Sequence, residues 1–234
     1  GFIGLGSQGG PMALRIAGAG LPLTVWARRA EAMAPFVAAG GRAAESVAAL
    51  GAACDLVGIC VVDDDGVKAI CAELTPAMQP GGRIAIHSTV LPETCAELAE
   101  QVAARGLSLI DAPVSGGGPG AEAGTLTVMC GGDVETFDAC KPGFETFRRV
   151  IVLLGPVGSG QRAKIVNNAL LAANMGLAQA ALAAGEALGC ECKALAELVN
   201  ASSGRSFGFE VFARLPAPAA FAHGAPLLLK DVNL

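Results

Sequence analysis

The sequence predicts an α/β protein in which a doubly wound parallel sheet is followed by an all-helical region. A glycine-rich turn near the start of the chain stands between a short apolar run and a helix-compatible segment. Apolar and helix-like segments then alternate as far as residue 154, and the strand-like segments stop after Gly155-Pro156. Uninterrupted apolar strands separated by helices are typical of a parallel sheet that is covered on both faces.

The first element is the turn Gly4-x-Gly6-x-x-Gly9. Its glycines permit a tight turn, a close approach of the backbone to a pyrophosphate, and close packing of helix on strand. The N-terminus of the next helix offers N–H groups to phosphates. A plain turn is the alternative, because a chain with 32 glycines contains such spacings by chance. The flanking strand and helix favour a Rossmann-type dinucleotide site, with contacts from Gly4, Gly6, Ser7, Gln8 and Gly9.

The second strand, Leu23–Ala27, leads into Arg28-Arg29. In an NAD site an acidic residue stands about 20 positions after the glycines and accepts hydrogen bonds from the ribose. That position falls on Arg28, and two guanidinium groups suit the 2′-phosphate of NADP. The alternative is a pair of solvated surface arginines near Glu31. We therefore predict NADP as the preferred cofactor, with NAD possible.

The remaining elements complete the first domain, which we predict over residues 1–155. Two closing strands around a helix are expected to enlarge the sheet. The predicted helices are 31–39, 46–53, 93–105 and 134–147, and the predicted strands are 56–62, 83–87, 107–112, 125–131 and 150–154.

The second predicted domain, residues 156–234, is helical and is expected to serve substrate binding and dimerisation. A long helix follows Gly158-Ser159-Gly160, a shorter one lies near Lys193–Asn200, and Leu227–Leu234 is helix-like. The missing initiator Met and the abrupt last segment lead us to expect a chain that is truncated at both ends.

The long helix has no charged residue from Ile165 to Gly185. Four amide side chains interrupt it and its alanines add little hydrophobicity, so protein is expected to bury it on most sides, rather than a membrane. A partner subunit is expected to supply cover, which predicts a homodimer or homotetramer.

Charge and cysteine content narrow the class further. A net charge of −5 without a basic cluster argues against nucleic-acid binding. The chain opens on the nucleotide motif, so we expect no signal peptide and a cytoplasmic location. The eight cysteines are scattered, and Cys190-x-Cys192 has no second pair beside it. We predict buried reduced thiols and no metal.

A second glycine-rich stretch, Asp111-Ala-Pro-Val-Ser-Gly-Gly-Gly-Pro119, follows a predicted strand. Ligands bind at the carboxyl ends of strands in open parallel sheets. Consecutive glycine N–H groups, with the Ser115 hydroxyl, can point at one anion. The alternative is a flexible Gly-Pro loop.

A third motif, Gly158-x-Gly160-x-x-x-Lys164, opens the long helix. Lys164 and Asn168 are four residues apart and share one helix face. A lysine that enters an uncharged helix is expected to be partly buried, which lowers its pKa toward values useful for proton transfer. Asn168 can orient a substrate oxygen. An ordinary lysine at a helix start is the alternative.

Taken together and in this order, the three motifs resemble the β-hydroxyacid dehydrogenase family, which includes 3-hydroxyisobutyrate dehydrogenases and tartronate semialdehyde reductases. The resemblance covers the whole chain. Its family patterns read like Gly-Phe-Ile-Gly-Leu-Gly-x-Met-Gly, Asp-Ala-Pro-Val-Ser-Gly-Gly and Lys-x-x-x-Asn. It implies hydride transfer between a nicotinamide cofactor and a small 3-hydroxy acid or the corresponding aldehyde or keto acid.

The resemblance also implies roles for individual residues. Lys164 would be the general acid/base, Thr89 would lie near the nicotinamide, and Lys230 of Lys230-Asp231 would close over the cofactor. Ser115, Gly116 and Gly117 would hold the substrate carboxylate with help from Asn168. Val62 and Asp63 would stand beside the cofactor.

Some positions depart from the family pattern. Gln8 replaces Met, and Asp63-Asp64-Asp65 replaces residues such as Leu-Pro, a turn we expect to be tolerated if its side chains point to water. The sequence has no Tyr, which excludes a tyrosine proton donor. The alternatives are an imine reductase, in which another residue usually replaces the lysine, and a catalytically silent NADP-binding interaction module; Lys164 counts against both. Arg205 is a candidate substrate contact, with a solvated arginine as its alternative.

Overall fold

The computed structural model describes residues 1–215 and 225–233. It divides into two compact units, Gly1–Lys164 and Ile165–Leu234. The predicted domain boundary at residue 155 lies before helix α8, whereas the units meet within that helix.

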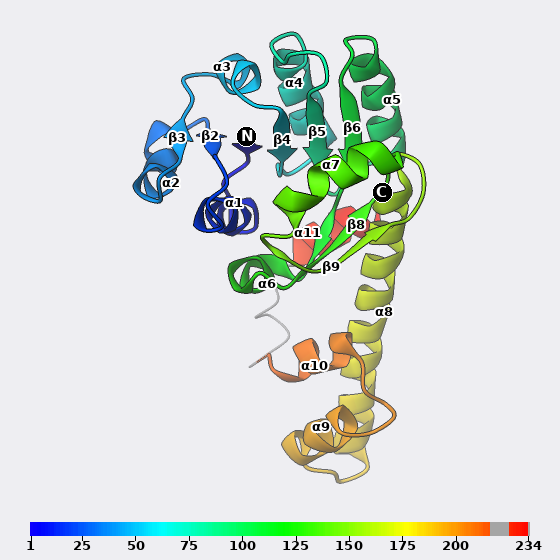
Figure 1. Cartoon of the computed structure of the whole chain (residues 1–234). Helices are drawn as coiled ribbons and strands as arrows, with labels where there is room; N and C mark the ends of the chain where they lie inside the picture. Colours follow the sequence, from blue (N-terminus) through cyan, green and yellow to red (C-terminus); the bar gives the residue numbers. More distant parts are fainter. Residues whose placement is uncertain (216–224, 234) are drawn as a thin grey trace. The chain divides into compact units, whose positions relative to one another are not determined.

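The first unit is built on a six-stranded parallel sheet with the order β3-β2-β1-β4-β5-β6 (Figure 1). This order places β1 beside both β2 and β4, and the crevice between the halves opens at the carboxyl ends of these strands. The predicted doubly wound Rossmann-type fold is confirmed. The strands are β1 (Phe2–Ile3), β2 (Thr24–Trp26), β3 (Arg42–Ala43), β4 (Leu56–Ile59), β5 (Arg83–Ile86) and β6 (Ser108–Asp111).

Helices cover both faces of this sheet because successive strand side chains point in opposite directions. Phe2, Ala85 and Ile110 join a core formed with helices α1, α2 and α7. Ile3 and Ile84 join the other core, which is formed with α3, α4 and α5. The helices are α1 (Gly9–Gly18), the 3₁₀ helix η1 (Ala30–Met33), α2 (Ala34–Ala38), α3 (Val47–Ala52), α4 (Asp64–Leu74), α5 (Pro92–Ala103) and α7 (Val134–Phe144).

The two predicted closing strands form a separate sheet rather than enlarging the first. β8 (Leu126–Cys130) pairs with β9 (Arg148–Leu153) in parallel and with β7 (Val114–Ser115) in antiparallel fashion. An isolated bridge between Asp111 and Gly131 links this three-stranded sheet to β6. The stretch expected as a glycine-rich loop becomes β7 and the short helix α6 (Gly117–Ala123) (Figure 1).

Helices are the regular secondary structure of the second unit in the residues that the structure describes. α8 (Ser159–Ala187) begins in the first unit and continues here, followed by α9 (Cys192–Asn200), α10 (Phe207–Ala213) and α11 (Ala225–Val232). The Glu191 carboxylate caps α9, and the Ser206 hydroxyl caps α10. The predicted all-helical region is confirmed for these residues, whereas Leu234 of the predicted last helix lies outside them.

Helix α8 is far more exposed than its composition led us to expect. The side chains of Leu170 and Leu177 are 62% and 66% exposed, and Val166 is exposed too. Among the described residues α8 is the one helix long and apolar enough to span a membrane, a test that core helices also pass. The described residues therefore leave this face of α8 uncovered, and cover by a partner subunit stays a prediction.

The cysteines are free, as predicted, but they are not all buried. Cys71, Cys95, Cys130 and Cys140 are buried, and burial raises the pKa of the Cys71 thiol to about 12. Cys190 and Cys192 are exposed because they flank the turn between α8 and α9.

Candidate active site

The glycine turn after β1 has the geometry of a dinucleotide-binding loop. Gly4 has a φ of +96°, and a Cβ there would overlap the carbonyl of Cys60. A Cβ on Gly9 would overlap the carbonyl of Gly4, whereas one on Gly6 would meet open space. Gly4 and Gly9 are thus required by the fold, and Gly6 leaves room for a ligand to approach the backbone. No side chain caps the start of α1 at Gln8, so these residues fit a bound pyrophosphate.

The end of β2 presents the predicted 2′-phosphate contacts. Arg28 and Arg29 are both exposed, and the Arg29 Nε lies 4.0 Å from Glu31 Oε1. An exposed pair at this distance is weak, so Glu31 does not neutralise the site. Both arginines directly follow β2. In Rossmann folds the residues at this position contact the adenosine ribose of the bound dinucleotide.

The acidic turn after β4 has structural roles. Asp63 Oδ1 accepts the N–H of Gly66 and caps α4 (2.9 Å). Asp64 Oδ1 accepts the N–H of Leu91 (3.0 Å) and the hydroxyl of Thr94 (2.6 Å), which ties the turn to the start of α5. The condition under which the turn was expected to be tolerated, side chains that point to water, is not met by Asp64, whose carboxylate is hydrogen-bonded within the protein instead. Asp63 is exposed and stays a predicted cofactor neighbour, as does the neighbouring Val62.

Asp111, at the carboxyl end of β6, holds the start of α8. Its Oδ1 accepts the N–H of Gly158 (2.6 Å) and its Oδ2 accepts the N–H of Gln161 (2.8 Å). A Cβ on Gly160 would crowd this carboxylate, so the glycine permits the close approach. Burial raises the pKa of the Asp111 carboxyl, and the backbone N–H donors oppose that rise. A carboxylate at a helix N-terminus stabilises the helix through its free N–H groups and its dipole.

The Gln161 side chain joins α8 to the loop that follows β5. Its Nε2 donates to the Ser88 carbonyl (2.8 Å), and its Oε1 accepts the N–H of Val90 (3.2 Å). The Ser88 hydroxyl in turn accepts the N–H of Val61 at the end of β4 (2.8 Å). Thr89, which lies between the two residues bonded by Gln161, is the predicted neighbour of the nicotinamide.

Lys164 follows Gln161 by three residues in α8 and is buried, with 8% of its surface exposed. Buried lysines are rare unless their ammonium group has partners or a function. The predicted partial burial is confirmed, while the lowered pKa stays a prediction. Sequence reasoning missed Gln161, Ser88 and the anchoring role of Asp111. The spacing of Gln161 and Lys164, which puts both on one helix face, was the available signal.

The predicted substrate-binding segment lies beside the glycine turn. Ser115 ends β7, and Gly116 and Gly117 have φ values of +133° and +63°, which glycine adopts without strain. A Cβ on Gly118 would lie 2.9 Å from the carbonyl oxygen of Ser7. The structure thus brings the predicted anion-binding segment next to the predicted cofactor loop.

Two further predicted residues belong to the second unit. Asn168 is buried, and its Nδ2 donates to Asp231 Oδ2 (2.8 Å) while its Oδ1 accepts from Asn167 (3.1 Å). Lys230 Nζ lies 2.9 Å from Asp231 Oδ1. The Asn168 amide therefore links α8 to α11, and Asp231 is a partner that sequence reasoning did not assign.

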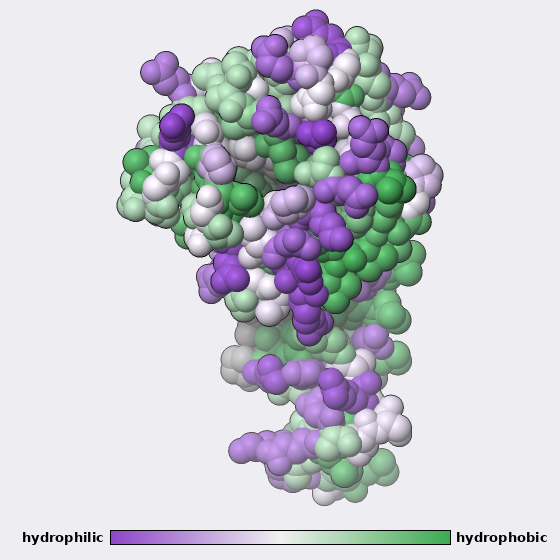
Figure 2. Space-filling model, viewed as in Figure 1, coloured by the Kyte–Doolittle hydropathy of each residue, from purple (hydrophilic) through white to green (hydrophobic). Residues whose placement is uncertain are grey.

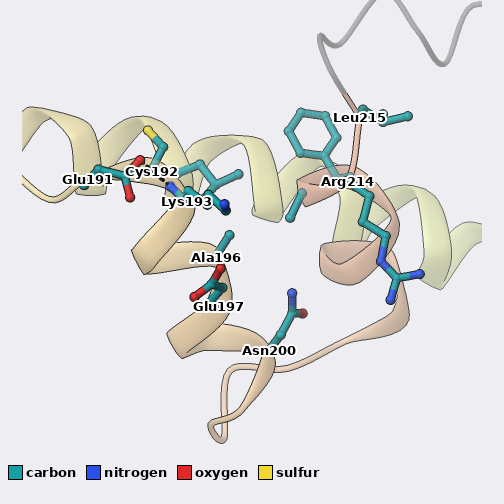
Figure 3. Close-up of a pocket in the computed structure, with 11 residues that line it drawn as sticks. Glu191, Cys192, Lys193, Ala196, Glu197, Asn200, Arg214 and Leu215 are labelled. Carbon is teal, nitrogen blue, oxygen red and sulfur yellow. Dashed lines mark hydrogen bonds between the residues drawn. The ribbon is translucent and has the colours of Figure 1, made fainter.

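The helical unit also contains an open hollow of about 470 Å³ between α8, α9 and α10 (Figure 3). Asn200 points into it, and Glu197, Lys193 and Arg214 are among its lining residues. None of the predicted site residues lines this hollow, so the candidate chemistry lies elsewhere.

Comparison with known proteins agrees with this geometry. Residues 1–155 match the family described as the NAD-binding domain of 6-phosphogluconate dehydrogenase. Residues 158–234 match the one described as NAD-binding of NADP-dependent 3-hydroxyisobutyrate dehydrogenase. The class is therefore that of NAD(P)-dependent hydroxyacid dehydrogenases.

Individual relatives narrow the class to a family. The chain is 40% identical to the NAD-dependent L-serine dehydrogenase of Pseudomonas aeruginosa and 36% identical to 3-hydroxyisobutyrate dehydrogenase of the same organism. Both matches cover 100% of this chain and 82% of the relative. The structure of Mycobacterium tuberculosis 3-hydroxyisobutyrate dehydrogenase with L-serine matches with a TM-score of 0.88 at 27% identity, over 99% of this chain and 83% of that one. The chain belongs to the β-hydroxyacid dehydrogenase family, as its motifs predicted.

Proposed function

We propose that this protein transfers a hydride between NADP and a small 3-hydroxy acid or the corresponding aldehyde or keto acid, with Lys164 as general acid/base. The observation that carries the proposal is a buried lysine in a helix whose first turn is bonded to residues at the carboxyl ends of β5 and β6. A dinucleotide on the glycine turn of β1 extends along the same edge of the sheet.

The cofactor supplies the redox chemistry when it is bound, and the protein supplies alignment and proton transfer. In the oxidative direction Lys164 accepts the proton of the substrate hydroxyl, while the hydride leaves the carbon that carries this hydroxyl. In reduction Lys164 returns the proton to the carbonyl oxygen. Thr89 would lie near the nicotinamide and Lys230 over the cofactor.

The substrate class follows from the two named relatives. L-serine and 3-hydroxyisobutyrate both carry a carboxylate and a hydroxyl on the carbon two bonds away. Ser115, Gly116 and Gly117 would bind this carboxylate through a hydroxyl and backbone N–H donors. Asn168 would assist from the same helix as Lys164.

The cofactor preference rests on Arg28 and Arg29. One relative is NAD-dependent by name, so the arginines after β2 are the feature that supports NADP for this chain. In steady-state assays with L-serine and 3-hydroxyisobutyrate, kcat/KM is expected to be roughly tenfold or more higher with NADP than with NAD, as expected for a charge-assisted phosphate contact. The double variant Arg28→Ala/Arg29→Ala should lose this preference while its activity with NAD persists. Comparable kcat/KM values for the two cofactors in the wild type would refute it.

We also propose that the protein is a homodimer or homotetramer. The surface over α8 is largely hydrophobic in Figure 2, and its leucines are exposed in the isolated chain. An apolar stripe on a helix of this length is typical of a buried subunit interface.

A further inference from the structure

The chain of hydrogen bonds through Gln161 connects the two parts of the proposed site that must face each other. We propose that Gln161 is a positioning residue, whose side-chain amide fixes the Ser88–Val90 loop relative to the turn of α8 that carries Lys164. This inference rests on the proposed function, in which Thr89 faces the nicotinamide and Lys164 moves the proton.

The amide of Gln161 forms hydrogen bonds with the backbone on both sides of Thr89. Its Nε2 donates to the carbonyl of Ser88, and its Oε1 accepts the N–H of Val90, at 2.8 Å and 3.2 Å. Two bonds of opposite polarity fix both the position and the direction of the intervening peptide units. The loop therefore cannot slide along α8 without breaking a buried bond.

The main chain of Gln161 is held as firmly as its side chain. Its N–H donates to Asp111 Oδ2, and Asp111 Oδ1 accepts the N–H of Gly158. Asp111 thus fixes the first turn of α8 on β6, and Gln161 fixes the β5 loop on that turn. The Ser88 hydroxyl extends the chain to Val61 after β4.

Glutamine is suited to this position for a chemical reason. The residue is fully buried, with 0% of its surface exposed, so water cannot replace a missing bond. A carbonyl needs a donor and an N–H needs an acceptor, and a neutral amide supplies both from one flat group. Methionine has a similar length but cannot donate a hydrogen bond.

The consequence is a separation between cofactor affinity and turnover. Lys164 stands three residues after Gln161, on the same helix face. Loss of the amide would let the Thr89 loop and Lys164 drift apart, whereas the glycine turn proposed to bind the pyrophosphate packs separately, with Gly4 close against the Cys60 carbonyl. Small errors in alignment lower the rate of the chemical step more than they lower binding.

The test compares Gln161→Met with a matched control, Thr136→Val. The control removes the 2.8 Å bond from a buried hydroxyl in α7 to Asp133, outside the site. With L-serine or 3-hydroxyisobutyrate, Gln161→Met should lower kcat roughly tenfold or more while the Kd for NADPH stays within about threefold of wild type. Thr136→Val should leave both unchanged.

Two measurements need no turnover. Hydrogen–deuterium exchange should accelerate at Ser88–Leu91 in Gln161→Met, and it should not do so in Thr136→Val. The fluorescence of bound NADPH should also change in Gln161→Met, because the nicotinamide end alone loses its fixed surroundings. An unchanged exchange rate at Ser88–Leu91 together with unchanged NADPH fluorescence overturns the inference.

A double variant separates this inference from the proposed function. In a Lys164→Ala background, Gln161→Met should cost less than about threefold in residual rate, because residues that act as a unit are not additive. An equal loss in both backgrounds shows a general structural role and overturns the positioning role. Full turnover of Lys164→Ala alone would instead refute the proposed function. Hydrogen–deuterium exchange at Ser88–Leu91 would then still test whether Gln161 holds this loop.

Discussion

At the scale of single residues, His87 shows how a titratable side chain can serve the core. It follows β5 directly and is buried among Phe2, Phe144 and Phe147, with ring-centroid distances of 5.9, 5.3 and 5.7 Å. A carbonyl oxygen only accepts hydrogen bonds, so His87 Nδ1 donates to the Ala112 carbonyl (2.8 Å). Burial lowers the pKa of His87 to about 4, against the smaller opposing effect of this bond.

The depressed pKa of His87 predicts a loss of stability in mild acid. The unfolded chain binds a proton at this residue between its ordinary pKa of 6.5 and about 4, and the folded protein does not. Stability therefore falls as the pH falls through that window, by about 2 kcal/mol between pH 7 and 4.5. Urea denaturation at both pH values should show a loss in the wild type that is smaller by this amount in His87→Phe. Equal losses in both proteins would contradict the assignment, because the other titrating groups are common to both.

Site residues could be predicted from the sequence where they belong to a motif. They were missed where their role depends on partners that are distant in the sequence. The glycines were predicted from their spacing between a strand and a helix, and Lys164 from its place in an uncharged helix and from the family resemblance. Gln161 and Asp111 were not assigned these contacts, because their bonds join groups 47 to 73 positions apart in the chain. Buried polar pairs of this kind leave no local periodicity.

At the scale of elements, the glycine turn combines positions that serve the fold with one that serves the ligand. Gly4→Ala should destabilise the protein by several kcal/mol, since its φ is +96° and its Cβ would overlap the Cys60 carbonyl. Gly6→Ala should leave the melting temperature within a few degrees, because its Cβ meets open space, yet weaken NADPH binding roughly tenfold or more. Thermal unfolding and fluorescence titration measure the two effects. Tight cofactor binding by Gly6→Ala would show that the ligand does not approach this turn.

The positions of the strands in the sequence were predicted better than their pairing in the sheets. The strands near 125–131 and 150–154 exist, but they pair with each other and with β7 instead of extending the first sheet. Alternation and apolar runs report burial, not the identity of the neighbouring strand. Helix α6 was missed because its Gly-Gly-Pro-Gly start has poor helix propensity, which tertiary contacts with α1 and β8 override.

At the scale of the whole molecule, the exposed face of α8 predicts assembly. Burying a leucine contributes about 1.5–3 kcal/mol, so a charge at two of these positions in each subunit should abolish association. Leu170→Glu/Leu177→Glu should therefore convert a dimer or tetramer into a monomer in light scattering coupled to size exclusion. Ala96→Glu, at an exposed site on α5, is the matched control and should keep the wild-type mass. A monomeric wild type, or an oligomer that survives both charges, would contradict the proposal.

The whole-molecule prediction from sequence was sound in class and incomplete in detail. A Rossmann-type sheet followed by helices could be predicted because glycine spacing and the end of the strand pattern are local signals. The need of α8 for extra cover was also expected, but which of its faces is left exposed could not be predicted, because an alanine-rich helix has the same composition whether its own chain or a partner covers it.

The central claim is that Lys164 performs the proton transfer, and its substitution tests that claim most directly. Lys164→Ala should lower kcat by roughly two to four orders of magnitude while the Kd for NADPH is retained. Lys164→Arg should not restore the rate, because a guanidinium keeps its charge but does not release its proton at neutral pH. Near-normal turnover of Lys164→Ala with L-serine or 3-hydroxyisobutyrate would contradict the account.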